Sequence, residues 1–334
     1  MFQVRQGAES PYPLLQDIEG AAGRLAGKVL QTPVWRWQTG IASQLSPQTE
    51  VWLKLELFQR TGSFKLRGAL NCIQALDDAA LARGVVTASA GNHAVAVAYA
   101  ARTAGTTAKL AIPRHASPVR VAACRDQGAE LLFTDTIHQA FALAQQLVAD
   151  EGRSMVHPFD GPLTAEGTAT IGLELMHQVQ ELDAVIVPVG GSGLCGGIAS
   201  AVKQINPSIQ VFGVEPYGAD AMHRSFQAGR PQVLEHVDTV ADSLGAPYAL
   251  DYSYGVCRRF VDEIVRVKDD EMVASMHHLF RDMKLVAEPA AAAATAALLG
   301  PVRERLDGMR VALIVCGSNI DNARFSELLA GYVQ

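Results

Sequence analysis

Short runs of β-branched and apolar residues alternate with longer segments of helical period from about residue 50 onwards. This alternation is typical of parallel strands covered by helices, so the pattern predicts an α/β fold rather than a helical bundle or a β-sandwich. The predicted strands are Val51–Leu55, Val85–Ser89, Ala108–Ile112, Glu130–Thr134, Met155–His157, Ala184–Pro188, Val211–Glu215, Ile264–Val267 and Val311–Cys316. The predicted helices include Asn92–Ala104, Pro118–Gln127, Ile137–Asp150, Gly167–Val179 and Asp269–Met283.

Two regions outside this alternation also carry a prediction. The first fifty residues predict a helix over Gln16–Ala26 and an extended segment over Gln31–Trp35, because the residue before Pro33 avoids the helical region. Ala287–Leu299 is mostly alanine, and it is too short and too weakly hydrophobic to cross a membrane. We expect this segment to form a closely packed, buried helix.

Composition narrows the class of protein. The chain has 334 residues, of which 49% are hydrophobic, so it can bury a sizeable core. Its formal charge of −6 and its lack of a long basic run disfavour nucleic acid as a partner. Five widely spaced cysteines without a CxxC pair disfavour a disulfide framework or a zinc site. Since the sequence also lacks a secretory signal and a long apolar stretch, we expect a cytoplasmic protein without a membrane span.

The glycine-rich segment 188–197 lies between a predicted strand and a helix expected to begin near Leu194. Successive glycine N–H groups can form an anion-binding nest, and the helix N-terminus adds its positive end, so the segment favours a phosphate. It lacks both the dinucleotide-binding pattern G-x-G-x-x-G with a later acidic residue and the P-loop pattern GxxxxGK[ST]. A purely structural glycine turn is the alternative.

Two further polar segments lie where a loop meets a predicted helix. Residues 61–68 contain Lys65, and a lysine amine can form a Schiff base with a carbonyl, although most lysines are solvated surface residues. Residues 89–93 follow a predicted strand and open a helix, so their N–H groups and polar side chains can hold a carboxylate or a ring oxygen. His93 by itself is more often a structural histidine.

Together these segments resemble the fold type II pyridoxal-phosphate enzymes, and more narrowly the serine/threonine dehydratase family. The motifs that carry the resemblance occur in the family's order over residues 15–325: Lys54-Leu-Glu56, Thr61-Gly-Ser-Phe-Lys-Leu-Arg-Gly68, Ala88-Ser-Ala-Gly-Asn-His-Ala94, the 188–197 glycine run, Ala287-Glu-Pro289 and Cys316-Gly-Ser-Asn319. The resemblance implies a tryptophan synthase β-like fold with two open parallel-sheet domains and the cofactor between them. It implies a large domain of residues 1–83 and 159–334, a small inserted domain of residues 84–158, and a homodimer.

The resemblance also implies roles for single residues. Lys65 would carry pyridoxal 5'-phosphate as a Schiff base. The other implied cofactor-binding residues are Phe64 beside the ring, Asn92 at the ring oxygen, Gly190, Gly191, Ser192, Gly193 and Leu194 at the phosphate, and Glu288, Cys316 and Ser318. Those implied for the substrate carboxylate are Ser89, Ala90, Gly91, Asn92 and His93.

Three departures from the family pattern bear on the chemistry. Cys316 stands where a serine commonly faces the ring nitrogen, with Ser318 as an alternative partner, and a neutral partner suits elimination better than transamination. Ala90 stands where serine-racemising relatives carry a hydroxyl, which disfavours racemisation. The metal-binding pattern of some relatives ends in an aspartate, but here Ala221 has that place and Asp220 is one position out of register, so we expect no metal.

The favoured function is β-elimination of water and loss of ammonia from a small 3-hydroxy amino acid, such as L-threonine or L-serine, to give a 2-oxo acid. Alternatives are a related dehydratase acting on 3-hydroxyaspartate, 3-phenylserine or a hydroxyectoine-derived amino acid, a serine racemase, a nicotinamide-dependent oxidoreductase, and a non-catalytic pyridoxal-phosphate protein. Fifteen residues follow Asn319, so we expect no C-terminal regulatory domain. The walls that select the substrate side chain are expected near residues 160–168 and 242–254.

Overall fold

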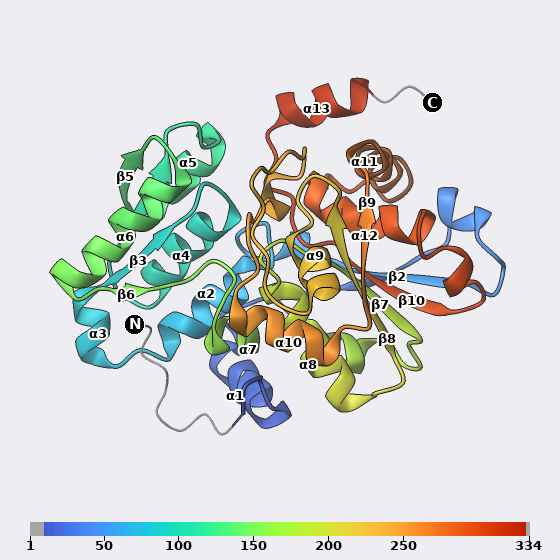
Figure 1. Ribbon diagram of the computed structural model, residues 1–334, viewed down its shortest axis with the longest axis horizontal. Helices are drawn as coiled ribbons and strands as arrows, with labels where there is room; N and C mark the ends of the chain where they lie inside the picture. The colour runs from blue at the N-terminus through green and yellow to red at the C-terminus, as the bar shows by residue number, and fades with distance from the viewer. Residues whose placement is uncertain (1–9, 332–334) are drawn as a thin grey trace.

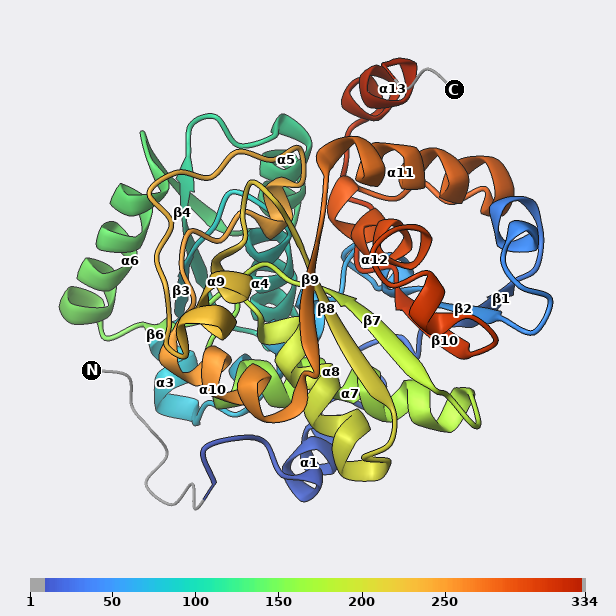
Figure 2. The ribbon, with the colours of Figure 1, turned by 45° about the vertical axis from the view of Figure 1, so that its right-hand side comes forward.

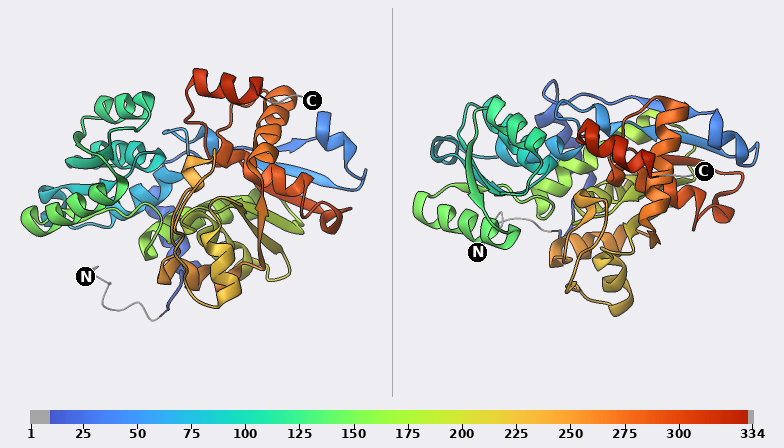
Figure 3. Two further views of the ribbon diagram at one scale, coloured as in Figure 1. Left: turned by 45° about the horizontal axis from the view of Figure 1, so that its top comes forward. Right: turned by 90° about the horizontal axis from the view of Figure 1, so that it is seen from above.

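The computed structural model describes residues 10–331, which form two β-sheets that lie side by side with helices packed on them (Figure 1 and Figure 3). The larger sheet contains, in spatial order, β1 (Val34–Trp37), β2 (Glu50–Lys54), β10 (Arg310–Ile314), β7 (Ala184–Pro188), β8 (Gln210–Pro216) and β9 (Glu263–Val267). The smaller sheet contains β5 (Glu130–Thr134), β4 (Ala108–Pro113), β3 (Val85–Ala88) and β6 (Ser154–Met155). β1 pairs with β2 antiparallel, and the other neighbouring strands are parallel, which confirms the predicted α/β class.

Helices cover both faces of each sheet. They are α1 (Leu15–Leu25), α2 (Lys65–Gln74), α3 (Asp78–Arg83), α4 (Asn92–Thr103), α5 (Pro118–Asp126), α6 (Ile137–Glu151), α7 (Pro162–Gln178), α8 (Gly193–Ile205), α9 (Ala221–Ala228), α10 (Asp251–Phe260), α11 (Asp269–Met283), α12 (Pro289–Leu299) and α13 (Asn322–Ala330). Figure 2 shows α11 and α12 on one face of the larger sheet and α7 and α8 on the other. In the smaller sheet, neighbouring residues of β3 point to opposite faces: Val85 packs with α4 and Val86 packs with α6.

The alanine-rich segment forms the buried helix that the sequence predicts. Residues 289–298 of α12 are all buried, and the helix contacts β7, β8, β9 and β10. Small side chains let its backbone approach the sheet closely, which gives the dense packing of a protein interior. None of the described helices is long and apolar enough to cross a membrane.

Two boundaries differ from the sequence prediction. α7 begins at Pro162 rather than at Gly167, because proline is well suited to the first position of a helix and the apolar periodicity starts only later. The strands of the smaller sheet all lie within residues 84–158, but α2 lies outside that range and still packs with its core through Leu66 and Leu70. The domain limits at 83/84 and 158/159 stay a prediction.

The packing of α7 against α2 generates a stability prediction. A Cβ at Gly167 would lie 2.6 Å from the carbonyl oxygen of Arg67 and 2.9 Å from Cα of Gly68, so the two helices are in backbone contact there. We expect Gly167→Ala to lower the free energy of unfolding by about 1–3 kcal/mol, because the helices must move apart. Urea unfolding of the purified protein measures this.

The matched control is Gly23→Ala on α1, where an added Cβ meets nothing within 4 Å. This change should raise the free energy of unfolding by about 0.5–1 kcal/mol, because alanine favours a helix over glycine. Equal effects of the two substitutions would contradict the close contact between α2 and α7.

Candidate active site

A cavity of about 640 Å³ opens where the carboxyl ends of strands from both sheets meet. Its small-sheet wall comes from the segments that follow β3 and β4, and its large-sheet wall comes from the loops around Gly191, Ser243, Glu288 and Asn319. Open α/β sheets bind their ligands at this edge. The cavity is therefore the place to look for the residues that the sequence singled out.

Lys65 is the first residue of α2 and lies in the wall of the cavity. The loop before it is attached to the segment after β10, because Phe64 N donates to the Cys316 carbonyl at 3.0 Å and Ser63 forms a β-bridge with Gly317. Lys65 Nζ donates to the carbonyl of Pro158 at 2.6 Å and lies 5.0 Å from the centre of the Phe64 ring. Burial lowers the pKa of Lys65 to about 8, against the opposing effect of Cys316 and Glu288. The amine is thus more readily deprotonated than that of an ordinary lysine, as a Schiff-base lysine requires.

The predicted glycine loop connects β7 to α8. Ser192 is the N-cap of α8 in a left-handed conformation, with φ of 75°, and no side chain caps this helix N-terminus. The Ser192 hydroxyl is buried and has no hydrogen-bond partner within the described residues. A Cβ at Gly191 would overlap the Phe159 ring, and one at Gly193 would overlap the Phe159 carbonyl, so the close approach requires glycine at both positions. The uncapped helix N-terminus and the unpartnered hydroxyl fit a bound phosphate.

The segment 89–93 leads from β3 into α4 on the opposite wall. The Ser89 hydroxyl accepts a hydrogen bond from the N–H of Gly91 at 3.1 Å. The Asn92 amide is oriented from both sides, since its Nδ2 donates to Glu288 Oε1 at 2.7 Å and its Oδ1 accepts from Asn319 Nδ2 at 2.9 Å. The positive end of α4 favours a carboxylate here. Ala90 presents only a methyl group to the cavity, as the sequence indicates.

A buried histidine, His93, and a partly buried one, His157, bind backbone groups of this region. His93 Nε2 lies 3.0 Å from the Val156 carbonyl, and burial together with the Lys65 charge lowers the pKa of His93 to about 3. His157 Nδ1 accepts a hydrogen bond from Asp160 N at 2.9 Å. Burial lowers the pKa of His157 to about 4, although Asp160 opposes the shift. Both side chains are therefore neutral near pH 7. The His93 ring is already in contact with the Val156 carbonyl, so only the backbone N–H of His93 is available to bind a carboxylate.

The two candidate partners of the ring nitrogen differ in position. Cys316 is buried and shares a small pocket with Lys65, Phe64 and Glu288, and burial raises the pKa of its thiol well above the usual value. The Ser318 hydroxyl instead faces the carbonyls of Leu57 and Gly62, at 3.3 and 3.4 Å, and does not line the cavity. The turn after Cys316 thus points the Ser318 side chain toward the loop before α2, and Cys316 is the better placed of the two proposed partners.

Sequence reasoning missed Arg120, which lies on α5 and links the two walls. Its Nη1 lies 2.5 Å from Asp242 Oδ2, its Nη2 lies 3.6 Å from Glu288 Oε2, and its Nε donates to the Asn319 carbonyl at 3.1 Å. Burial raises the pKa of Glu288 to about 7, although the Arg120 charge opposes the shift. A single arginine on a helix gives no sequence signal, because its three partners lie more than one hundred residues further along the chain.

An aromatic wall was also only partly predicted. Phe141 of α6, Phe159 and Tyr248 line the cavity, and the rings of Phe159 and Tyr248 have their centres 6.0 Å apart. Tyr248 lies within the expected region 242–254, but no residue of 160–168 lines this cavity. Phe141 and Phe159 come from separate segments, and neither follows a motif.

The region of the metal-binding pattern is occupied by internal contacts. The Asp220 carboxylate pairs with Arg224 Nε at 2.7 Å and with Arg266 Nη1 at 3.0 Å, while Glu215 accepts hydrogen bonds from the N–H groups of Met222 and His223. Among residues 10–331, no group of three or more His, Cys, Asp or Glu side chains is arranged to hold a metal ion. The expectation of no metal stays a prediction.

Known proteins resemble this chain over nearly its whole length. A family model described as pyridoxal-phosphate dependent enzyme matches residues 26–317. Phenylserine dehydratase of Ralstonia pickettii is 49% identical over 95% of this chain and 96% of that protein, and the catabolic L-threonine dehydratase of Escherichia coli K12 is 39% identical over 96% of each. A solved structure of maize serine racemase is 35% identical, with a TM-score of 0.88 over 95% of this chain and 98% of that one.

These two histidines predict how the free energy of unfolding depends on pH. In the unfolded chain each histidine takes up a proton below its usual pKa of about 6.5, whereas in the folded protein His93 and His157 stay neutral down to pH of about 3 and 4. At these two histidines the unfolded state binds more protons between about pH 6.5 and 4, so their contribution to stability falls as the pH falls through this window. Glu215 and Glu288 act in the opposite direction, because burial raises the pKa of their carboxyl groups to about 8 and about 7. We expect a loss of about 1.4 kcal/mol per pH unit for each histidine.

Urea unfolding of the wild-type protein and of His157→Asn at pH 7, 6 and 5 measures the contribution of His157. As the pH falls, the variant should lose less unfolding free energy than the wild type, by up to about 1.4 kcal/mol per pH unit. A variant with the wild-type slope would show that His157 is not held neutral in the folded protein.

Proposed function

The chain belongs to the fold type II pyridoxal-phosphate enzymes, in the serine/threonine dehydratase family, and we propose that it eliminates water from a 3-hydroxy amino acid of the 3-phenylserine class. The tryptophan synthase β-like fold, the cofactor and the β-elimination of hydroxy amino acids are confirmed for this chain as properties of its family. The proposal concerns the substrate, the site residues and their roles.

The observation that carries the choice of substrate is the greater likeness to a phenylserine dehydratase than to the L-threonine dehydratases. It favours 3-phenylserine over the expected L-threonine or L-serine. The aromatic wall supports the same choice, because Phe141, Phe159 and Tyr248 offer ring faces and edges against which a substrate ring can pack.

The residues of the cavity fit pyridoxal phosphate. The loop 190–194 would hold its phosphate, Lys65 would form its covalent link, and Asn92 and Cys316 would contact its ring. When bound, the cofactor supplies an electron sink for the carbon that loses a proton. The neutral Cys316 thiol carries no charge to the ring nitrogen, in keeping with elimination.

The chain's own residues then orient the substrate and move its proton. The N–H groups at the start of α4 would bind the substrate carboxylate, with Ser89 holding the turn that presents them. Lys65 Nζ, with its pKa lowered to about 8, would remove the α-proton as a general base. Ala90 offers no group that can return a proton from the opposite wall. The expected products are a 2-oxo acid and ammonia.

We also propose that the protein acts as a cytoplasmic homodimer in amino acid catabolism, as the family resemblance implies. Gel filtration with light scattering tests the assembly.

Substrate preference gives the first functional prediction. Steady-state assays of 2-oxo acid release should give a higher kcat/KM for 3-phenylserine than for L-threonine or L-serine. Phe141→Ala should lower kcat/KM for 3-phenylserine roughly 30-fold, because about 2 kcal/mol of apolar contact is lost, and should affect L-threonine much less. The matched control is Phe133→Ala on β5 of the smaller sheet, a partly buried aromatic residue outside the cavity. A higher kcat/KM for L-threonine or L-serine than for 3-phenylserine would refute the proposed substrate.

Product stereochemistry gives the second functional prediction. Because Ala90 provides no proton donor, 2-oxo acid should form in large excess over amino acid inverted at the α-carbon. Chiral chromatography of the reaction mixture measures both products. Inverted amino acid formed at a rate comparable to 2-oxo acid would show that a second proton-transferring group acts on the opposite face.

A further inference from the structure

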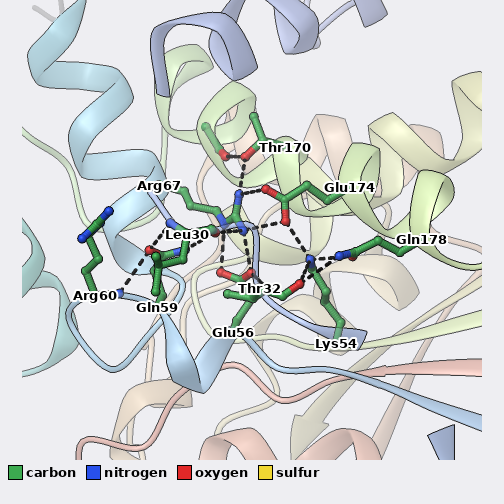
Figure 4. Close-up of polar contacts among 11 residues, drawn as sticks. Leu30, Thr32, Lys54, Glu56, Gln59, Arg60, Arg67, Thr170, Glu174 and Gln178 are labelled. Carbon is green, nitrogen blue, oxygen red and sulfur yellow. Dashed lines mark hydrogen bonds and ion pairs between the residues drawn. The ribbon is translucent and has the colours of Figure 1, made fainter. Parts of the chain in front are cut away.

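Four charged side chains form a largely buried cluster beside α2, outside the lining of the cavity (Figure 4). The members of this ion cluster are Lys54, Glu56, Arg67 and Glu174. Arg67 binds Glu56 through two hydrogen bonds of 2.7 and 2.9 Å and Glu174 through two of 2.7 and 2.9 Å. Lys54 Nζ lies 2.7 Å from Glu174 Oε2. Three of the four belong to motifs that carry the family resemblance, and none of them contacts the cavity.

The ion cluster is balanced in charge and in hydrogen bonds. Its two cations face two carboxylates, and the side chains of Lys54, Glu56 and Arg67 are fully buried. Arg67 also donates to Thr170 Oγ1 and to the Leu30 carbonyl, both at 3.2 Å. Buried ion pairs add little net stability compared with well-packed apolar residues, since desolvation offsets their attraction. The paired hydrogen bonds do define a fixed geometry between Arg67 and its two carboxylate partners.

The helix that contains Arg67 is attached to both halves of the molecule. The apolar face of α2, with Leu66, Leu70 and Ile73, packs with the core of the smaller sheet. Arg67 instead binds Glu56, which follows β2 of the larger sheet, and Glu174, which lies on α7. On the side of the larger sheet, α2 also has backbone contact with α7 at Gly68, and the loop before it is bound to the segment after β10, so Arg67 adds an ionic link to these contacts.

Arg67 lies in the same helical turn as Lys65. Successive residues of an α-helix are about 100° apart around its axis, so side chains two positions apart point in nearly opposite directions. Lys65 faces the cavity and Arg67 faces the ion cluster. No side chain caps this end of α2, so Arg67 is a lateral anchor for the turn. The loop 190–194, to which the Lys65 amine must be aligned, follows β7 of the larger sheet.

We propose that Arg67 is a positioning residue: its ion pairs with Glu56 and Glu174 anchor the first turn of α2 to the larger sheet and so hold Lys65 Nζ in alignment with the loop 190–194. The proposal rests on Lys65 as the lysine that links the cofactor. On this proposal the Lys54-Leu-Glu56 motif and Arg67 share one role: they hold Lys65 in position and do not touch the cofactor.

The test compares two charge-balanced double variants as holoenzymes. Arg67→Met with Glu56→Gln removes the anchor and leaves the Lys54–Glu174 pair. Arg24→Met with Glu166→Gln is the matched control, because Arg24 pairs with Glu166 at 2.8 Å and contacts Asn71 further along α2, away from the first turn. In each protein we would measure total bound cofactor, the fraction that borohydride fixes to Lys65 by peptide mapping, kcat and KM.

The Arg67 variant should bind cofactor through the loop 190–194 but lose much of the label at Lys65. Its kcat should fall roughly 10- to 100-fold, because displacement of a reacting group by about 1 Å has an effect of this size. KM should change little, since the carboxylate site on α4 is untouched. The control should keep the wild-type label and kcat.

Equal labelling and equal kcat in the two double variants would overturn the proposal. Label on another lysine in the wild-type protein would instead refute the assignment of Lys65. The positioning role of Arg67, which depends on that assignment, would then be wrong as well. Should the Arg67→Met, Glu56→Gln protein fail to fold, the same measurements on Arg67→Lys test the proposal. Lysine keeps the charge but cannot form two hydrogen bonds with each carboxylate. A folded Arg67→Lys protein with full Lys65 labelling and wild-type kcat would contradict the proposal.

Discussion

The site depends on the attachment of the loop before α2 to the segment after β10. β2 and β10 of the larger sheet run side by side, and beyond their carboxyl ends Ser63 and Gly317 form a separate antiparallel β-bridge. The hydrogen bond from Phe64 N to the Cys316 carbonyl places α2 so that its first residue, Lys65, opens into the cavity. Other loops reach the same edge because parallel strands place their carboxyl ends together. Residues from distant parts of the chain thus meet without any local signal of proximity.

Burial disfavours the charged form of four groups at this cavity. It lowers the pKa of Lys65 and of His93, and it raises the pKa of Cys316 and of Glu288. A lysine amine with a pKa near the working pH can take a proton and return it, which is the condition for general base catalysis. Arg120 keeps its charge, but Asp242 and Glu288 face it. The aromatic wall supports the proposed aryl substrate.

The fold class and the motifs could be predicted from the sequence, but the contacts between residues of different motifs could not. Buried parallel strands such as β7 appear as continuous apolar runs, and the glycine loop is explicit, so both could be predicted. Arg120 could not, because a helical arginine has many exposed equivalents and its partners are remote in sequence. Motifs in the sequence include Lys54, Glu56 and Arg67 of the ion cluster. Glu174 could not be predicted as their partner, because it lies on a different helix far along the chain. The side-chain direction of Ser318 depends on a turn whose geometry no pattern specifies.

A crystal structure of the holoenzyme tests the central claim most directly, namely that this cavity holds the cofactor on Lys65. The account predicts continuous electron density from Lys65 Nζ into the cavity, with the phosphate at the N–H groups of residues 190–194 and the ring nitrogen next to the Cys316 thiol. Density joined to a different lysine, or a phosphate bound away from this loop, would contradict it.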